Sequence, residues 1–271
     1  MGENWLAQLR AFYDKRVKEL ERYDDEPALN GYKAPGGSPY WTQDIQERLL
    51  DDITTKLRLA PEYYVLDVGC GTGMMLRHIA PRVAHIVGVD FSQSMIDHAK
   101  RYAPENATLL RQDAVSLSFK DQMFDRVLCY SVVMNILDDD FTRSLLTELV
   151  RVTKNGGLTL IGNVPDSEKQ KEQVEVIRKL QWNQPMPHPR PLQRIIGRPR
   201  DLWRYRIRRS VAPSQGNRFY AKDFFRNFAH RVDCDINIQP VNVPGFVYAP
   251  FRFDVLLTPR STTRKFSANY A

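Results

Sequence analysis

The order of apolar and polar positions predicts a chain that alternates between short strands and amphipathic helices. Apolar runs of the length of buried strands are separated by stretches with apolar residues three or four positions apart. Strands are predicted at 64–68, 86–90, 109–114, 124–130, 158–164, 234–240 and 250–257. Helices are predicted at 3–25, 42–59, 74–79, 92–99, 142–153, 166–180 and 221–232. Strict alternation up to residue 164 predicts an α/β fold with a parallel, doubly wound sheet.

The stretch from Tyr63 to Gly73 reads YYVLDVGCGTG and carries the clearest chemical signal. A buried strand ends near Asp67, and glycines follow at 69, 71 and 73 before the next helix. Glycine allows a sharp turn and lets a ligand approach the backbone. In doubly wound sheets a nucleotide-like ligand binds at this place, between the end of a strand and the N-terminus of a helix.

A second acid stands where a ribose would need it. The next strand ends at Asp90, which lies 21 residues after Gly69, and an acid at about this spacing accepts hydrogen bonds from ribose hydroxyls. Ser92 is predicted to cap the following helix, whose inner face includes Met95. The two strands therefore predict a site for a nucleoside at their carboxyl ends.

These motifs, taken in order, resemble the class I S-adenosylmethionine-dependent methyltransferases, in their small-molecule branch. DVGCGTG resembles motif I of the family, and three further stretches follow at the family's intervals over residues 60–165. They are LLRQDA (109–114), FDRVLCYSVVMNILDD (124–139) and KNGGLTLIGNV (154–164). The resemblance implies a Rossmann-like seven-stranded sheet whose last strand is antiparallel, with S-adenosylmethionine as the cofactor.

The resemblance also implies roles for individual residues. The methionine end of the cofactor would lie against Asp67 and the loop Gly69, Cys70, Gly71 and Gly73, with Tyr13, Tyr130 and Ser131 nearby. The adenosine end would be bound by Asp90, Phe91, Ser92, Met95, Asp113 and Ala114. Tyr13 stands in FYDKR, which resembles a tyrosine of the family's N-terminal arm.

A single domain of 271 residues is expected, with four parts. They are a helical arm (1–59), the cofactor-binding core (60–164), a basic lid insertion between the fifth and sixth strands (165–220), and a closing helix and hairpin (221–271). The expected inner residues of the first arm helix are Trp5, Leu6, Leu9, Phe12, Val17 and Leu20.

The positive charge of the chain is concentrated in one region. Residues 164–231 hold 16 Lys and Arg against 6 Asp and Glu. This surplus of 10 positive charges exceeds the net charge of +7 of the whole chain. Residues 191–209 interleave apolar side chains with arginines, a pattern that suits an anionic or lipid-linked acceptor, an anionic membrane surface, or a nucleic-acid backbone. A solvated lid without a ligand is the simpler alternative.

A hydroxyl acceptor needs a general base, and His188 is the candidate because it lies within the lid. The other four histidines, at 78, 85, 98 and 230, lie on or beside core elements and are expected to be structural. Asp138, Asp139 and Asp140 precede a helix, where acids usually cap and interact with the helix dipole. No metal is predicted.

The sequence favours O-methylation of a small molecule with a sugar-, nucleotide- or lipid-linked hydroxyl. The motif of amino-directed nucleic-acid methyltransferases is missing after the fourth strand, which reads YSVVMN. Two alternatives stay open: an RNA methyltransferase that grips RNA with the arginine-rich lid, and a catalytically silent partner subunit. The second alternative arises because Met134 and Asn135 stand where many members of the family carry a histidine in a Glu-His-like pair.

Three cysteines without metal spacing predict buried free thiols, in keeping with a reducing compartment. The first 16 residues are charged throughout and lack the apolar segment of a secretion signal. A cytoplasmic protein is therefore expected, with peripheral membrane contact only through residues 191–209. The oligomeric state does not follow from the sequence.

Overall fold

The computed structural model describes residues 4–20, 42–182 and 218–261. Its strands are β1 Tyr64–Val68, β2 His85–Asp90, β3 Ala107–Arg111, β4 Phe124–Tyr130, β5 Thr153–Pro165, β6 Cys234–Pro240 and β7 Arg252–Pro259. Its helices are α1 Asn4–Leu20, α2 Gln43–Leu57, α3 Met74–Ile79, α4 Gln93–Lys100, α5 Asp139–Val152, α6 Gln170–Trp182 and α8 Lys222–Arg231.

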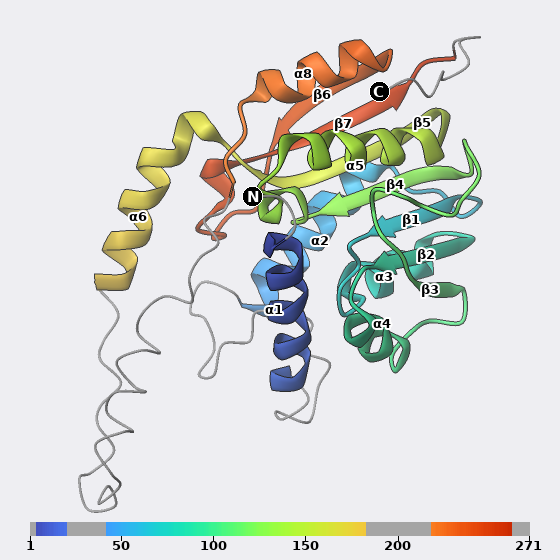
Figure 1. Cartoon of the computed structure of the whole chain (residues 1–271), viewed down its shortest axis with the longest axis horizontal. Coiled ribbons are helices and arrows are strands. Elements are labelled where there is room, and N and C mark those ends of the chain that lie inside the picture. The colour runs from blue at the N-terminus through green and yellow to red at the C-terminus, as the bar shows by residue number, and fades with distance from the viewer. Residues whose placement is uncertain (1–3, 21–41, 183–217, 262–271) are drawn as a thin grey trace, which may run out of the picture.

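The strands form one sheet in the order β3-β2-β1-β4-β5-β7-β6 (Figure 1). Neighbouring strands are parallel except for β7, which runs antiparallel to both β5 and β6. The strand order reverses between β1 and β4, which is where such sheets bind ligands at their carboxyl edge. The predicted doubly wound sheet with an antiparallel last strand is confirmed.

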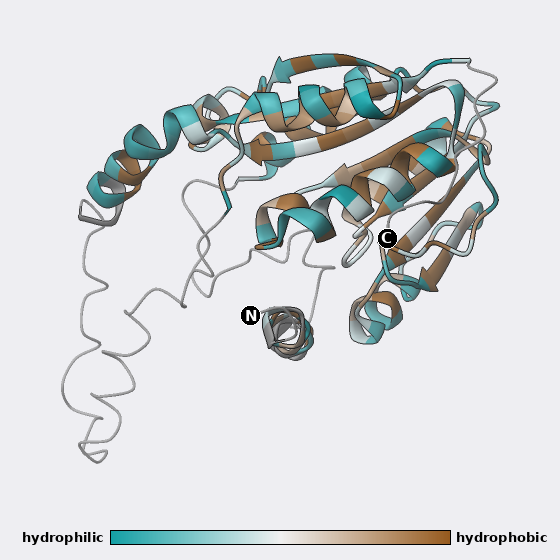
Figure 2. Ribbon diagram, turned by 45° about the horizontal axis from the view of Figure 1, so that its top comes forward, coloured by the Kyte–Doolittle hydropathy of each residue, from teal (hydrophilic) through white to brown (hydrophobic). Residues whose placement is uncertain are grey.

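Helices cover both faces of the sheet. Buried side chains of α2, α3 and α4 form one core with the sheet, and those of α5 and α8 form the other. Figure 2 shows the strands largely hydrophobic and the helices hydrophilic on their outer sides, as expected for amphipathic helices packed on a sheet. The three cysteines are buried and free, as predicted. No helix in the described ranges is both long and apolar enough to cross a membrane.

Polar caps fix the start of three helices. The Thr42 side chain accepts the Ile45 amide hydrogen at α2, and Ser92 accepts that of Met95 at α4, as its position predicted. At α5 the Asp138 carboxylate accepts from the amides of Asp140 and Phe141. The acid cluster before α5 therefore includes a helix cap, the role that its position suggested.

Two expectations about local structure differ from the outcome. Phe12, expected inside, is 52% exposed, because the inner stripe of α1 is narrow and runs through Trp5, Leu9, Tyr13 and Val17 at intervals of four. The side chains of Leu6 and Leu20 are outside the described part. Strand β3 ends at Arg111, so Asp113 lies in the following turn, where its carboxylate accepts from the Val115 amide at 3.2 Å.

The insertion after β5 is described only at its two ends. Asp166 and Tyr220 form an isolated bridge at its base, and Lys222 pairs with Asp166 at 2.6 Å. From there α6 extends away from the body of the sheet (Figure 1). Residues 183–217, with His188 and the basic segment 191–209, are outside the described residues. The lid therefore stays a prediction.

Candidate active site

The glycine loop follows β1 at the carboxyl edge of the sheet. Gly69, Gly71 and Gly73 have φ of +75°, +54° and +80°, a region that side chains other than glycine rarely adopt. A Cβ on Gly69 would lie 2.4 Å from Cγ2 of Val132, so the segment after β4 packs directly on the loop. A Cβ on Gly71 would meet nothing within 4 Å, which leaves that part of the backbone accessible to a ligand.

Asp90, at the end of β2, fastens the loop from the side. One carboxylate oxygen accepts from the Gly71 amide at 3.0 Å, and the other accepts from the Ser92 amide at 2.9 Å. Burial raises the pKa of Asp90 in spite of these amide donors. The acid predicted to bind a ribose thus lies beside the exposed backbone of Gly71.

Asp67 lies next to Asp90 and is almost fully buried. Its Oδ2 has no hydrogen-bond partner within the described ranges. Burial, together with the charge of Asp90, raises the pKa of Asp67 to about 7. Two carboxyl groups therefore share a dry environment behind the glycine loop, and only Asp90 is fully hydrogen-bonded.

Helix α1 crosses part of the carboxyl edge of the sheet, from the start of α5 toward α4 (Figure 1). Near its start, Trp5 stacks edge-on against Phe141 of α5, with ring centroids 5.2 Å apart. Near its centre, the Tyr13 ring packs against the Phe91 ring, with ring centroids 6.0 Å apart. Asp14 accepts hydrogen bonds from Ser92 at 2.8 Å and from Ser94 at 2.6 Å. The arm thus covers the region between α5 and α4.

Residues 65–157 match the protein family described as a methyltransferase domain. This segment is similar to a methyltransferase domain. The ubiquinone biosynthesis O-methyltransferase of Rickettsia conorii is 24% identical over 176 residues, which are 60% of this chain and 58% of that protein. The demethylmenaquinone methyltransferase of Streptomyces avermitilis is 31% identical over 160 residues, 56% of this chain and 63% of that protein. This chain thus spans about three-fifths of the length of these relatives.

The fold is that of known structures of this class. A structure described as the DhpI-SAM-HEP complex has a TM-score of 0.60 at 16% identity, and the match covers 96% of this chain and 100% of that one. Identity at this level supports the fold alone. The seven-stranded sheet, the glycine loop and the order of the motifs therefore agree with the class I methyltransferase domain.

The segment that follows β4 is held in place by side-chain amides. Ser131 has φ of +61°, and its hydroxyl accepts a hydrogen bond from Asn163 Nδ2 at 2.8 Å. Asn135 donates to the Ser131 carbonyl at 2.9 Å. The Tyr130 ring lies over Gly162, where a Cβ would be 2.1 Å from the ring, and so it leans toward β5 and away from the glycine loop.

The remaining predicted cofactor residues are distributed around the loop. Cys70 is buried in the core on the α2 side, and Met95 is also buried. Phe91 lies under Tyr13 and Arg10 of the arm. Asp113 and Ala114 follow β3 in the turn beyond its end. The structure thus brings the predicted residues of 1–20 and 60–131 to the carboxyl edge of four neighbouring strands.

Two of the described histidines and two acids at the start of α5 contact neighbouring side chains. His85 Nε2 lies 3.0 Å from the Thr108 hydroxyl, and the His98 ring lies 5.7 Å from that of Tyr102. Asp139 pairs with Arg218 and Asp140 with Arg143. Within the described residues no group of three potential ligands forms a metal site. The assignment of His188 as a base stays a prediction.

Sequence reasoning missed three residues at the site. Val132 packs on Gly69, Asp14 bonds the cap of α4, and Asn163 bonds Ser131 from the end of β5. Each acts across a distance of 32 or more residues, as with the 32 residues between Ser131 and Asn163. No local pattern marks such contacts, although Asn163 lies near the end of a predicted strand.

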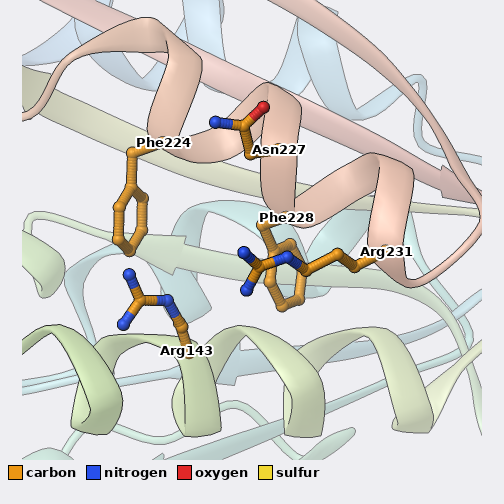
Figure 3. A pocket seen from close by; sticks show the side chains of 5 residues that line it. All are labelled: Arg143, Phe224, Asn227, Phe228 and Arg231. Atoms are coloured by element: carbon orange, nitrogen blue, oxygen red, sulfur yellow. The ribbon is translucent and has the colours of Figure 1, made fainter.

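A surface depression between α5 and α8 is separate from this site. It is lined by Arg143, Phe224, Asn227, Phe228 and Arg231 (Figure 3). The guanidinium of Arg143 lies 5.2 Å from the Phe224 ring and also pairs with Asp140. None of the predicted site residues lines this depression.

Proposed function

We propose that the chain is an S-adenosylmethionine-dependent methyltransferase that transfers a methyl group to a small molecule, with a hydroxyl oxygen as the favoured acceptor. The observation that carries the proposal is the glycine loop with Asp90 bonded to it, closed from above by α1. Names of relatives in ubiquinone and menaquinone formation favour a quinone-type ring as the acceptor. A sugar-, nucleotide- or lipid-linked hydroxyl is the wider class.

The residues present fit the cofactor. The accessible backbone at Gly71 leaves room for the methionine end, and Asp90 beside it has the oxygens that a ribose requires. Phe91, Met95, Asp113 and Ala114 would surround the adenine. Asp67, Cys70 and Ser131 would border the amino-acid end. Tyr13 would cover the cofactor from the arm.

S-adenosylmethionine supplies an electrophilic methyl group on a sulfonium sulfur. What the chain contributes is orientation and the exclusion of water, which are the main sources of rate for a direct displacement. The glycine loop and Asp90 would fix one reactant, and α1 would shield it from solvent. A base for the acceptor hydroxyl is assigned to His188 as a prediction only.

The test is label transfer. The purified protein is incubated with methyl-labelled S-adenosylmethionine and a fractionated cell lysate, and the labelled fraction is identified. Label in a small-molecule or lipid fraction supports the proposal. Label in RNA would replace it with an RNA methyltransferase, and label nowhere in spite of cofactor binding would indicate a silent partner subunit.

The control is Asp90→Ala, which removes the acid placed at the ribose. We expect cofactor affinity to fall about tenfold or more, since hydrogen bonds to a charged group are worth about 1.5–3 kcal/mol each. Calorimetry gives the affinity, and a melting curve shows whether the loop that Asp90 also holds is still folded. Unchanged affinity would contradict the ribose assignment.

A further inference from the structure

Two polar atoms at the carboxyl ends of β4 and β5 are buried without a hydrogen-bond partner in the described part of the chain. They are the Tyr130 hydroxyl and Oδ1 of Asn163. Nearly all buried polar groups in folded proteins are paired, so each exception needs an explanation. Their place near Ser131, at the carboxyl edge of the sheet, suggests a ligand as the missing partner.

Both side chains are held in place by the surrounding structure. The Tyr130 ring occupies space that exists only because residue 162 is glycine. Asn163 has a backbone φ of +59°. Its backbone N–H donates to Asp254 Oδ1 at 2.7 Å, and its side-chain Nδ2 donates to the Ser131 hydroxyl at 2.8 Å. The two orphan atoms are therefore fixed in position before any ligand arrives, which lowers the entropic cost of binding.

Asn163 is held by Asp254, which forms a buried ion pair with Lys56. Lys56 of α2 donates to Asp254 at 2.7 Å, to Asp52 at 2.6 Å and to the Pro240 carbonyl at 2.8 Å. The Asp254 carboxylate thus accepts from both Lys56 and the Asn163 amide. It holds Asn163 but has no recorded bond to the Tyr130 hydroxyl.

Apolar side chains pack around the Tyr130 ring, and the charged groups of Asp52, Arg252 and Asp254 lie near its hydroxyl. Tyr130 belongs to a core cluster that also contains Ile45, Leu49, Val241, Val243 and Phe246, from α2 and from the segment between β6 and β7. A phenol hydroxyl that can donate and an amide oxygen that can accept suit a neutral hydroxyl group, which does both. The apolar surroundings suit a ring or chain that carries it.

We propose that Tyr130 and Asn163 bind the methyl acceptor, and that the acceptor is a neutral hydroxylated aromatic ring. This inference rests on the proposed function and reassigns Tyr130 from the cofactor to the acceptor, because its ring leans toward β5 and away from the glycine loop. Tyr130 donates to the oxygen of the acceptor, and Asn163 Oδ1 accepts from a hydroxyl hydrogen.

The test compares Tyr130→Phe with the wild type, using methyl-labelled S-adenosylmethionine and propylcatechol as the acceptor probe. We expect KM for propylcatechol to rise about tenfold, with cofactor affinity by calorimetry unchanged within about twofold. The melting temperature should stay the same or rise, because an unpaired buried hydroxyl is removed. A hydroxyl with only a packing role would leave KM unchanged, which would overturn the inference.

Tyr220→Phe is the matched control. The Tyr220 hydroxyl is buried but bonded, 3.0 Å from the Thr142 hydroxyl and 3.2 Å from the Val133 carbonyl. Loss of the Tyr220 hydroxyl should lower the melting temperature and leave KM for propylcatechol unchanged. Tyr130→Phe should do the opposite, because it should raise KM without lowering the melting temperature. Asn163→Gly, which keeps the left-handed backbone, should raise KM as Tyr130→Phe does.

The two proposals fail in different ways. A wild-type protein that binds S-adenosylmethionine but neither binds nor methylates propylcatechol would overturn the acceptor class and leave the proposed function standing. A wild-type protein that does not bind S-adenosylmethionine at all would overturn the proposed function itself.

Discussion

Asp67 and Asp90 lie side by side behind the glycine loop but differ in their partners. Both oxygens of Asp90 accept from backbone amides, whereas Oδ2 of Asp67 has no partner among the described residues. Burial and the neighbouring charge therefore raise the pKa of Asp67 to about 7. The Asp67 carboxyl group therefore loses its proton near neutral pH, and the charged form lowers the free energy of unfolding.

The sign of this effect gives a prediction for Asp67→Asn. The native state of the wild type holds the Asp67 proton up to about pH 7, while the unfolded chain releases it near pH 3.8. The free energy of unfolding therefore falls as pH rises between these values. Asn lacks this penalty, so the variant should be more stable than the wild type at pH 8, by on the order of 2 kcal/mol. The difference should vanish near pH 4.

Urea unfolding at pH 4, 6 and 8 measures this difference. Asp97→Asn is the control, because Asp97 is exposed and bonds only Gln93 among its recorded contacts. A gain in Asp67→Asn that does not change with pH would contradict the assigned titration.

At the same scale, the sequence allowed some site residues to be predicted and concealed others. Gly69, Gly71 and Gly73 stand out because a left-handed backbone and a close contact leave a visible trace in composition. Asp14 does not, since an acid on an exposed-looking helix gives no sign that Ser92 will lie 2.8 Å away. Residues defined by tertiary contact need the fold before they can be found.

At the scale of elements, a buried ion pair fastens α2 to the sheet. Lys56 lies between Asp52 of its own helix and Asp254 of β7, and the side chains of Lys56 and Asp254 are almost fully buried. Burial raises the pKa of Asp254 to about 6 although Lys56 favours the charged form. Removing the cation would leave two acids together in a dry environment.

Lys56→Met should therefore destabilise the protein by about 3–5 kcal/mol at pH 8, the usual effect of breaking a buried pair from one side. The loss should be smaller at pH 5, where Asp254 can take up a proton, and smaller again in the double variant with Asp254→Asn. Chemical unfolding gives these values.

Lys179→Met serves as the comparison for this prediction. Lys179 pairs with Glu175 on the exposed face of α6, and such surface pairs contribute little. Its melting temperature should equal that of the wild type. Equal effects of the two lysine variants would contradict a special role for Lys56.

The elements themselves were largely predictable from periodicity. Strands β1, β4 and β6 begin and end within a residue of the expected positions, because buried strands require continuous apolar runs. The prediction of the inner face of α1 was wrong at Phe12. A helix that contacts the rest of the protein at a few points buries a narrower stripe of side chains than a helix packed along a sheet. The antiparallel direction of the last strand followed from the family resemblance, and periodicity alone does not determine it.

At the scale of the whole molecule, α1 connects the two halves of the carboxyl edge. Trp5 rests on α5, and Tyr13 with Asp14 rests on the residues that follow Asp90. A cofactor bound at the glycine loop would lie under this helix. Its exchange therefore depends on contacts outside the loop.

Asp14→Ala tests this dependence. We expect dissociation of S-adenosylmethionine to become about tenfold faster, because two hydrogen bonds to a carboxylate that keep the arm in place are lost. Stopped-flow displacement measures the rate, and Asp97→Ala on the neighbouring helix is the control. An unchanged rate would show that the arm does not cover the cofactor.

The position of α1 has a consequence for turnover. The spent cofactor is as large as the fresh one apart from a methyl group, so it has to leave by the same covered route. Its residence time is then set by how often the contact at Phe141 and the contact at Phe91 open together. Many enzymes are limited by product release, and here the limiting barrier would lie in α1.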